Sequence, residues 1–263
     1  MTAPSDGGAS IDPRIRQRRE QVERSRTQRR LRQLGVVGLV VALVLLGAVL
    51  LHTPLFEAKV VTVTGRHPNT PTSAIEAAAG LLHHPPLISV DPGPTAARVE
   101  SLPFIASARV TRHWPDAVTI AVTERQPVTV MAGPATSWST LDGYGRTLAV
   151  ARGKPTLPTL VVHVGTSPVP PAPVGGTLSP AAEPGLAVAR SLPPAFAGQV
   201  TSITVAADGT VSLALNSGLT VLLGTVSDLA AKYEDVAAII AHAPLRGAHT
   251  IDVTVPQSPT VGP

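Results

Sequence analysis

Cysteine is absent from this 263-residue chain, and its absence excludes disulfide bonds, thiolate metal sites and a cysteine nucleophile together. Aromatic residues are scarce, at 3% of the sequence, while small aliphatic residues, glycine and proline are abundant. Lysine is rare as well, because only Lys59, Lys154 and Lys232 occur and all other permanently positive side chains are arginine. This composition suits small domains with modest cores and disfavours a large enzyme with a deep pocket.

Positive charge gathers near the N-terminus. The formal net charge is +4, but nine arginines lie in one short stretch, namely Arg14, Arg16, Arg18, Arg19, Arg24, Arg26, Arg29, Arg30 and Arg32. The residues after Leu51 carry twelve basic and thirteen acidic side chains, so they are close to neutral. Basic tails can bind nucleic acid, yet this one leads directly into an apolar segment. We therefore expect a membrane context for the tail and no nucleic-acid partner.

The apolar segment, residues 34–51, contains no charged or strongly polar side chain. As a helix it would span about 27 Å, close to the thickness of the hydrocarbon core of a bilayer. A cleaved signal peptide would have a shorter apolar run, a short basic region before it and a small-residue cleavage site after it. A buried helix of a soluble domain would be amphipathic, whereas this segment is apolar on all sides. A single transmembrane helix is therefore the interpretation that fits best.

The arginines flank only the N-terminal side of residues 34–51. By the positive-inside rule, residues 1–33 form a basic cytoplasmic tail, and everything after the helix faces outward. The sequence thus predicts a single-pass protein of the inner or plasma membrane, in contact with the lipid bilayer.

Residues 57–125 show the pattern of a small α+β module. The expected elements are a strand at 57–65, a helix at 71–80, a second helix within 91–102, and strands at 107–110 and 117–123 around a turn at 114–116. Thr72 or Ser73 is the expected cap of the first helix, and Gly80 is its expected stop. Helices on one face of a three-stranded sheet are the predicted arrangement.

Residues 127–255 are expected to form a second domain, mostly of β-strands, followed by a tail at 256–263. The expected elements are strands at 128–131, 137–141, 159–164, 199–206, 210–215, 219–223 and 250–255, and helices at 183–192 and 227–243. Residues 125–127 join the two domains, and a pair formed by Glu124 and Arg125 is a candidate to brace this junction.

Five stretches carry a resemblance to a known family: VVTVTG (60–65), LISVDP (87–92), RVESLPFIASARVTRHWPDAVTIAVTERQPV (98–128), LTVLLG (219–224) followed by Lys232, and IDVTVP (251–256). The most specific part is the cluster Leu102-Pro103, Arg112, Trp114-Pro115 and Glu124-Arg125-Gln126-Pro127. Together these stretches resemble the FtsQ/DivIB family of bacterial cell-division proteins. The chain departs from the usual pattern in a proline-rich insert, residues 168–173, and in His113, which stands between Arg112 and Trp114.

The resemblance implies an α+β fold, with one transmembrane helix followed by a POTRA-like α/β module and a mostly β C-terminal domain. It also implies a non-enzymatic scaffold at the division septum. Such a scaffold binds and bridges membrane-anchored division proteins of the FtsB/FtsL type through the last strand region. The alternative is a membrane-anchored assembly or secretion factor, because POTRA-like modules serve there too. Those proteins continue into a barrel, whereas this sequence stops soon after its expected last strand, so we favour the division scaffold.

Residues suited to catalysis do not form a recognisable constellation. His83 and His84 are adjacent and so point to different faces, and no neighbouring histidine or carboxylate has metal-ligand spacing. The turn at 142–145 is rich in glycine but lacks a P-loop lysine and the G-x-G-x-x-G spacing, so a hairpin turn is expected there. No serine lies in a G-x-S-x-G elbow. We expect no enzyme activity, no catalytic residue, no metal and no cofactor.

The expected partner-binding residues are Thr250, Ile251, Asp252, Val253, Thr254 and Val255. Only a short polar tail follows them, so this strand is expected at the edge of its sheet, where a partner strand can add through main-chain hydrogen bonds. Its alternation predicts Ile251, Val253 and Val255 toward the core and the other three side chains on the opposite face. The alternative is that the strand only closes the sheet and binds no partner.

Overall fold

The computed structural model describes residues 33–47, 49, 56–242, 247–256 and 258–262. The expected basic tail, residues 1–33, therefore lies outside the described residues except for Gln33, and so does part of the expected membrane segment, residues 34–51. Residues 33–47 and Val49 are helical, and nearly all of their side chains are exposed. In the part of the chain that is described, no helix is both long enough and apolar enough to cross a membrane.

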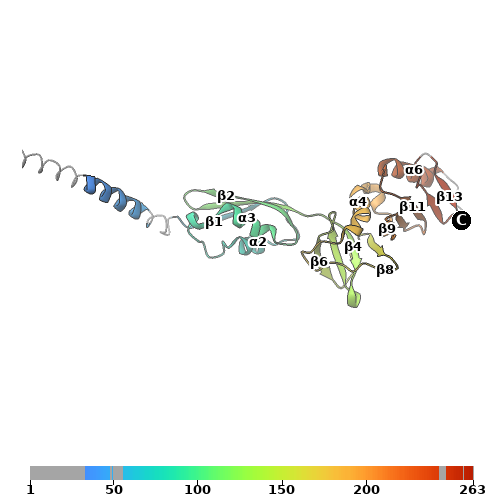
Figure 1. Ribbon diagram of the computed structural model, residues 1–263, viewed down its shortest axis with the longest axis horizontal. Coiled ribbons are helices and arrows are strands. Elements are labelled where there is room, and N and C mark those ends of the chain that lie inside the picture. The colour runs from blue at the N-terminus through green and yellow to red at the C-terminus, as the bar shows by residue number, and fades with distance from the viewer. Residues whose placement is uncertain (1–32, 48, 50–55, 243–246, 257, 263) are drawn as a thin grey trace, which may run out of the picture.

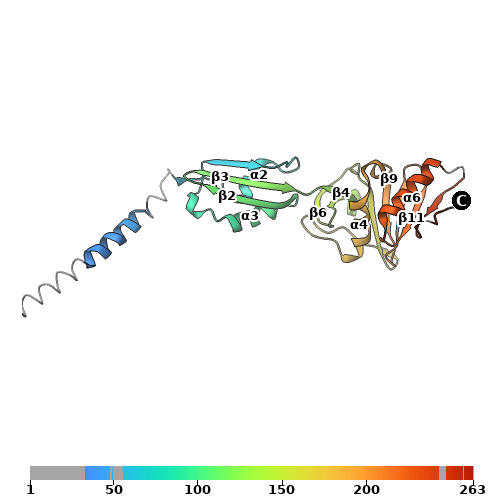
Figure 2. The ribbon, with the colours of Figure 1, turned by 90° about the horizontal axis from the view of Figure 1, so that it is seen from above.

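A three-stranded sheet comes first, in the order β1-β3-β2 (Figures 1 and 2). Its strands are β1 (Val60–Thr64), β2 (Ile105–His113) and β3 (Ala117–Glu124), with β1 parallel and β2 antiparallel to β3. Between β1 and β2 the chain forms α2 (Thr72–Ala79), the short 3-10 helix η2 (Leu87–Ser89) and α3 (Pro92–Glu100). Inward residues of the strands, such as Ile120, are completely buried with Ile75 of α2 and Val99 of α3. The predicted packing of helices on one face of the sheet is confirmed.

The first helix begins one residue earlier than its side chains suggest. Pro71 is the N-cap, and no side-chain hydrogen bond caps the helix. The prediction that Thr72 or Ser73 is the cap is therefore wrong, because the carbonyl of Pro71 already accepts the first helical N–H groups and leaves both residues inside the first turn. The predicted stop is confirmed, since Gly80 adopts a left-handed backbone with φ of 76° and its N–H donates to helix carbonyls.

A ten-stranded sheet follows in the sequence, and Figure 1 shows it beyond the first sheet along the long axis of the molecule. The strand order is β13-β12-β11-β10-β9-β7-β4-β5-β6, and β8 pairs with β7 outside this path. The strands are β4 (Pro127–Ala132), β5 (Trp138–Asp142), β6 (Thr147–Ala151), β7 (Thr159–Val164), β8 (Ser167–Pro168), β9 (Val200–Val205), β10 (Val211–Leu215), β11 (Thr220–Gly224), β12 (Thr250–Asp252) and β13 (Thr260–Gly262).

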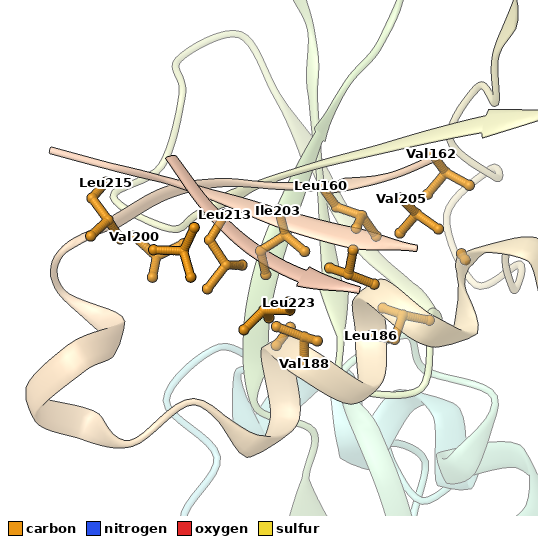
Figure 3. Packing of buried hydrophobic residues seen from close by; sticks show 14 of the residues in the cluster. Leu160, Val162, Leu186, Val188, Val200, Ile203, Val205, Leu213, Leu215 and Leu223 are labelled. Carbon is orange, nitrogen blue, oxygen red and sulfur yellow. The ribbon is translucent and has the colours of Figure 1, made fainter. Parts of the chain in front are cut away.

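Helices cover this sheet and complete its core, namely η4 (Pro180–Ala182), α4 (Glu183–Ser191), α5 (Pro194–Ala197) and α6 (Leu229–His242). The short 3-10 helix η3 (Pro134–Thr136) connects β4 to β5 and has no buried residue. Figure 3 shows strand residues such as Ile203 and Leu213 directed toward Leu186 and Val188 of α4. Gly185 lets α4 come close to the sheet, because a Cβ there would lie 2.6 Å from Leu160 and 2.7 Å from Val205. A small module of three strands with helices and a second, mostly β region make up an α+β fold, as predicted.

Three short strands were not expected from the sequence. In β6, Thr147 and Leu148 are both buried although they are neighbours, so the alternation that marks a strand is missing. β8 has two residues, and the second of them, Pro168, is the first residue of the proline-rich insert, residues 168–173. β13 contains Gly262 and follows Pro259, and neither residue favours a strand.

Candidate partner-binding surface

Strand β12 is anchored to the sheet on one side. It runs parallel to β11, with Thr250 opposite Thr220 and Ile251 opposite Val221. The N–H of Val253 donates to the carbonyl of Leu222 over 3.0 Å. Ile251 and Val253 are both completely buried, as the alternation predicted. These two side chains fix the register of β12 against the core.

The other side of β12 is not a free edge. Strand β13 pairs with it in antiparallel register, with Ile251 opposite Val261 and Asp252 opposite Thr260. The prediction that residues 250–255 form the edge strand is therefore wrong. A three-residue segment of the expected tail folds back, and its backbone groups satisfy those that β12 would otherwise expose. In the described part of the sheet, β13 is the outermost strand at this end.

The end of the candidate segment leaves the sheet earlier than expected. The ladder stops at Asp252, whose carboxylate accepts the N–H of Thr254 over 2.9 Å. Thr254 is exposed, as predicted, but Val255 is also exposed, at 61%, although the alternation placed it in the core. Once the backbone turns at Asp252, the two-residue repeat no longer sets the direction of side chains.

Helix α6 packs beside this end of the sheet, and Lys232 holds its start. The Lys232 side chain is completely buried, and its Nζ donates to the carbonyls of Leu223 and Thr225 over 2.8 and 2.7 Å. Both acceptors lie at the end of β11 and just beyond it. A buried ammonium held by two carbonyls therefore ties α6 to the strand that carries β12.

Two hollows of about 350 Å³ each lie along α6. One is lined by Asp235, Ala238, Ile239 and His242 of α6 and by Pro259 of the segment that leads into β13. The other is lined by Ser191, Pro193, Ala230, Tyr233, Glu234 and Ala237. The helix thus offers shallow, largely apolar contact surface, and the hollow that includes Pro259 borders the segment that leads into β13.

Tyr233 joins α6 to α4 and α5. Its hydroxyl lies 2.9 Å from Ser191 Oγ, and its ring packs against Phe196 with centroids 6.1 Å apart. Burial raises the pKa of the Tyr233 phenol above its ordinary value, and the hydrogen bond with Ser191 offsets part of this rise. Tyr233 therefore has a structural role, because its buried side chain holds α6 against α4 and α5.

The junction between the two sheets is held by Arg125, although not in the expected pair. Arg125 donates to Asp142 over 2.9 Å and to the carbonyl of Ile105 over 3.2 Å. The Glu124 carboxylate instead accepts hydrogen bonds from Asn69 and Thr70. The two neighbours point to opposite sides of the strand, so each braces a different part of the fold.

The edge of β2 is a second place where a strand could add. The N–H of Ala108 does not pair with β3 and instead donates to the Glu100 carboxylate over 2.9 Å. A groove of about 540 Å³ runs between β2 and the start of α3. This edge is therefore partly blocked by a side chain of its own module.

Candidate catalytic groups have structural roles. Among the described residues, no three His, Cys, Asp or Glu side chains cluster so that they could hold a metal ion. His84 hydrogen-bonds the carbonyl of Ala58 over 2.9 Å through Nδ1. The predicted hairpin turn after β5 is confirmed, with Asp142 accepting the N–H groups of Tyr144 and Arg146.

Two family models match successive parts of the chain. A model of the FtsQ-type POTRA domain matches residues 56–125, which contain the three-stranded sheet and its helices. A model of the C-terminal region of the cell-division proteins FtsQ/DivIB matches residues 130–254, which contain most of the ten-stranded sheet.

Several relatives bear the name cell division protein FtsQ. The one from Mycobacteroides abscessus is 30% identical over 98% of this chain and 89% of its own length. The one from Mycobacterium tuberculosis is 30% identical over 87% of this chain and 68% of its own length. The one from Streptomyces collinus is 31% identical over 88% of each protein. The likeness therefore extends over both sheets.

Proposed function

Because the chain belongs to the FtsQ/DivIB family of bacterial cell-division proteins, we propose that it is a non-enzymatic, single-pass scaffold of the division machinery. It binds membrane-anchored division proteins of the FtsB/FtsL type at the septum and bridges them. Residues 57–125 and 127–255 are its two domains outside the membrane, joined at 125–127.

The membrane layout rests on the uncharged run of residues 34–51 and the arginines before it. A reporter that works only in the cytoplasm should be silent when fused after residue 263. The same reporter fused before Met1 should be active, which controls for expression. An active C-terminal fusion would contradict this topology.

The proposed binding site is supported by the position of β12 in the sheet. One side of this strand is fixed by β11 and by the completely buried Ile251 and Val253, while its other side pairs, among the described residues, with the three residues of β13. A partner strand that takes the place of β13 on that side would make backbone hydrogen bonds with Thr250 and Asp252, at about 0.5–1.5 kcal/mol each. Such a contact needs no catalytic group, and its modest strength suits regulated assembly.

The proposal is tested by capturing FtsB/FtsL-type proteins from solubilised membranes with the tagged full-length chain. Replacing Thr250 of β12 and Thr254 just beyond it together by Glu adds two charges beside the edge that the partner strand would use, and we expect about a tenfold loss of capture. Thr123→Glu, at an exposed position of β3, is the matched control and should capture normally. Thermal unfolding checks that each variant is folded. If the double variant keeps both its fold and its capture, the β12 site is wrong.

A further inference from the structure

Strand β13 occupies the same ladder of β12 that the proposed partner strand would use. Its residues 260–262 pair one to one with residues 252–250. The N–H of His249 adds a bond of 3.0 Å to the carbonyl of Gly262, just before the ladder begins. In main-chain terms, this segment already makes the contacts that a bound partner would make.

The pairing of β13 is weak compared with that of β12. Its three residues include Gly262, and Pro259, which precedes them, has no N–H to donate. Thr260 is exposed and Val261 is 42% exposed, whereas Ile251 and Val253 on β12 are completely buried. Opening β13 therefore costs little apolar burial and few hydrogen bonds, while β12 stays attached to the core.

We propose that β13 is an internal cap, which holds the β12 edge closed until a partner strand displaces it. Pro259, which directly precedes the cap, forms one wall of the hollow beside Ile239 and His242 of α6. A partner that displaces the cap gains the backbone groups of Thr250 and Asp252. The inference rests on the proposed use of the β12 edge. Because a partner can bind only while the edge is open, its apparent affinity is its intrinsic affinity multiplied by the fraction of chains in which the edge is open.

The cap can be tested without the natural partner, with a labelled synthetic peptide of residues 256–263. The full-length chain should not bind this peptide, because its own segment competes at a high effective concentration. A chain ending at residue 256 should bind it. The variant Thr260→Pro keeps the chain length but removes the backbone N–H of Thr260 from β13, so it should also bind the peptide. If neither variant binds the peptide while both remain folded, the cap is wrong.

A disulfide bond between β12 and β13 would hold the cap permanently closed, which is the opposite of removing it. Because the chain has no cysteine, Asp252→Cys with Thr260→Cys introduces a single pair at directly opposed positions of the ladder. The oxidised form should capture FtsB/FtsL-type proteins at least about tenfold less than its reduced form, and the chain ending at 256 should capture about tenfold more than the full-length chain. Equal capture by the oxidised and reduced forms would overturn the cap.

The two failures can be told apart. If truncation and locking change nothing but the Thr250 and Thr254 double variant still loses capture, the cap is wrong and the β12 site stands. A second outcome is that the peptide binds only the chain without its cap, while capture is the same in the full-length, truncated, disulfide-locked and Thr250/Thr254 variants. In that case the partners bind elsewhere. The regulatory role of the cap then falls together with the proposed site.

Discussion

The Arg125 guanidinium lies 2.9 Å from the Asp142 carboxylate and so links the end of the three-stranded sheet to the hairpin that joins β5 to β6. Asp142 uses one oxygen for this pair and the other for the N–H groups of Tyr144 and Arg146. Its side chain is only 4% exposed, and that of Arg125 is 22% exposed. The pair therefore fixes the chain at the point where the three-stranded sheet ends and the ten-stranded sheet begins.

Arg125→Gln should loosen this junction. The variant leaves a buried carboxylate oxygen of Asp142 without its partner, which should lower the free energy of unfolding by about 1–3 kcal/mol. Limited proteolysis should first cut the wild-type chain outside residues 110–123, and cleavage near 125–127 should become faster in the variant. Arg109→Gln, at an exposed position of β2, is the control and should leave both measurements unchanged. First cuts within 110–123 would contradict the proposed domain boundary.

Lys232→Met should destabilise the C-terminal domain. The variant keeps a side chain of similar length but leaves the carbonyls of Leu223 and Thr225 without their donor, at a cost of about 1–3 kcal/mol. Lys59→Met removes the same charge from an exposed position, so it should change stability by less than about 0.5 kcal/mol. Denaturant unfolding compares the two. Equal stability of both variants would mean that the buried ammonium is not needed.

Tyr233 should make stability depend on pH in the alkaline range. Since burial raises its pKa, the folded state holds the phenol proton more tightly than the unfolded state does. This contribution to stability is complete below pH about 10, the ordinary tyrosine pKa, and is lost as the pH rises through the raised pKa. In a Tyr144→Phe background Tyr233 is the only tyrosine, so ultraviolet titration follows it alone. Phenolate that forms at the ordinary pKa with the fold intact would contradict this prediction.

Much of the fold was predictable where apolar residues recur with a regular period. The strand expected at 159–164 is β7, and the helix expected at 183–192 is α4 to within one residue. The C-terminal helix α6 was also predictable from its periodicity. The burial of Lys232 in this helix and its hydrogen bonds to carbonyls near the end of β11 were not. Amphipathic periodicity reports which face of an element is buried. It does not report that a charged side chain can be buried by bonding to carbonyls of another element.

The candidate surface was only partly predictable for the same reason. The alternation of residues 250–253 correctly placed Ile251 and Val253 in the core. The pairing of β12 with β13 depends on a segment of Thr, Val and Gly after a proline, which carries no strand signal of its own. The partner of Arg125 was likewise hidden, because Asp142 is distant in sequence and only the fold brings the two together.

We propose above that this chain binds a membrane-anchored division protein at the β12 edge. Photo-crosslinking in dividing cells tests it most directly, with a photoreactive amino acid at exposed Thr254 and, as the control, at exposed Thr123 of the first sheet. We expect position 254 to crosslink to an FtsB/FtsL-type protein and position 123 not to do so. Crosslinks to such a protein from position 123 but not from 254 would contradict it.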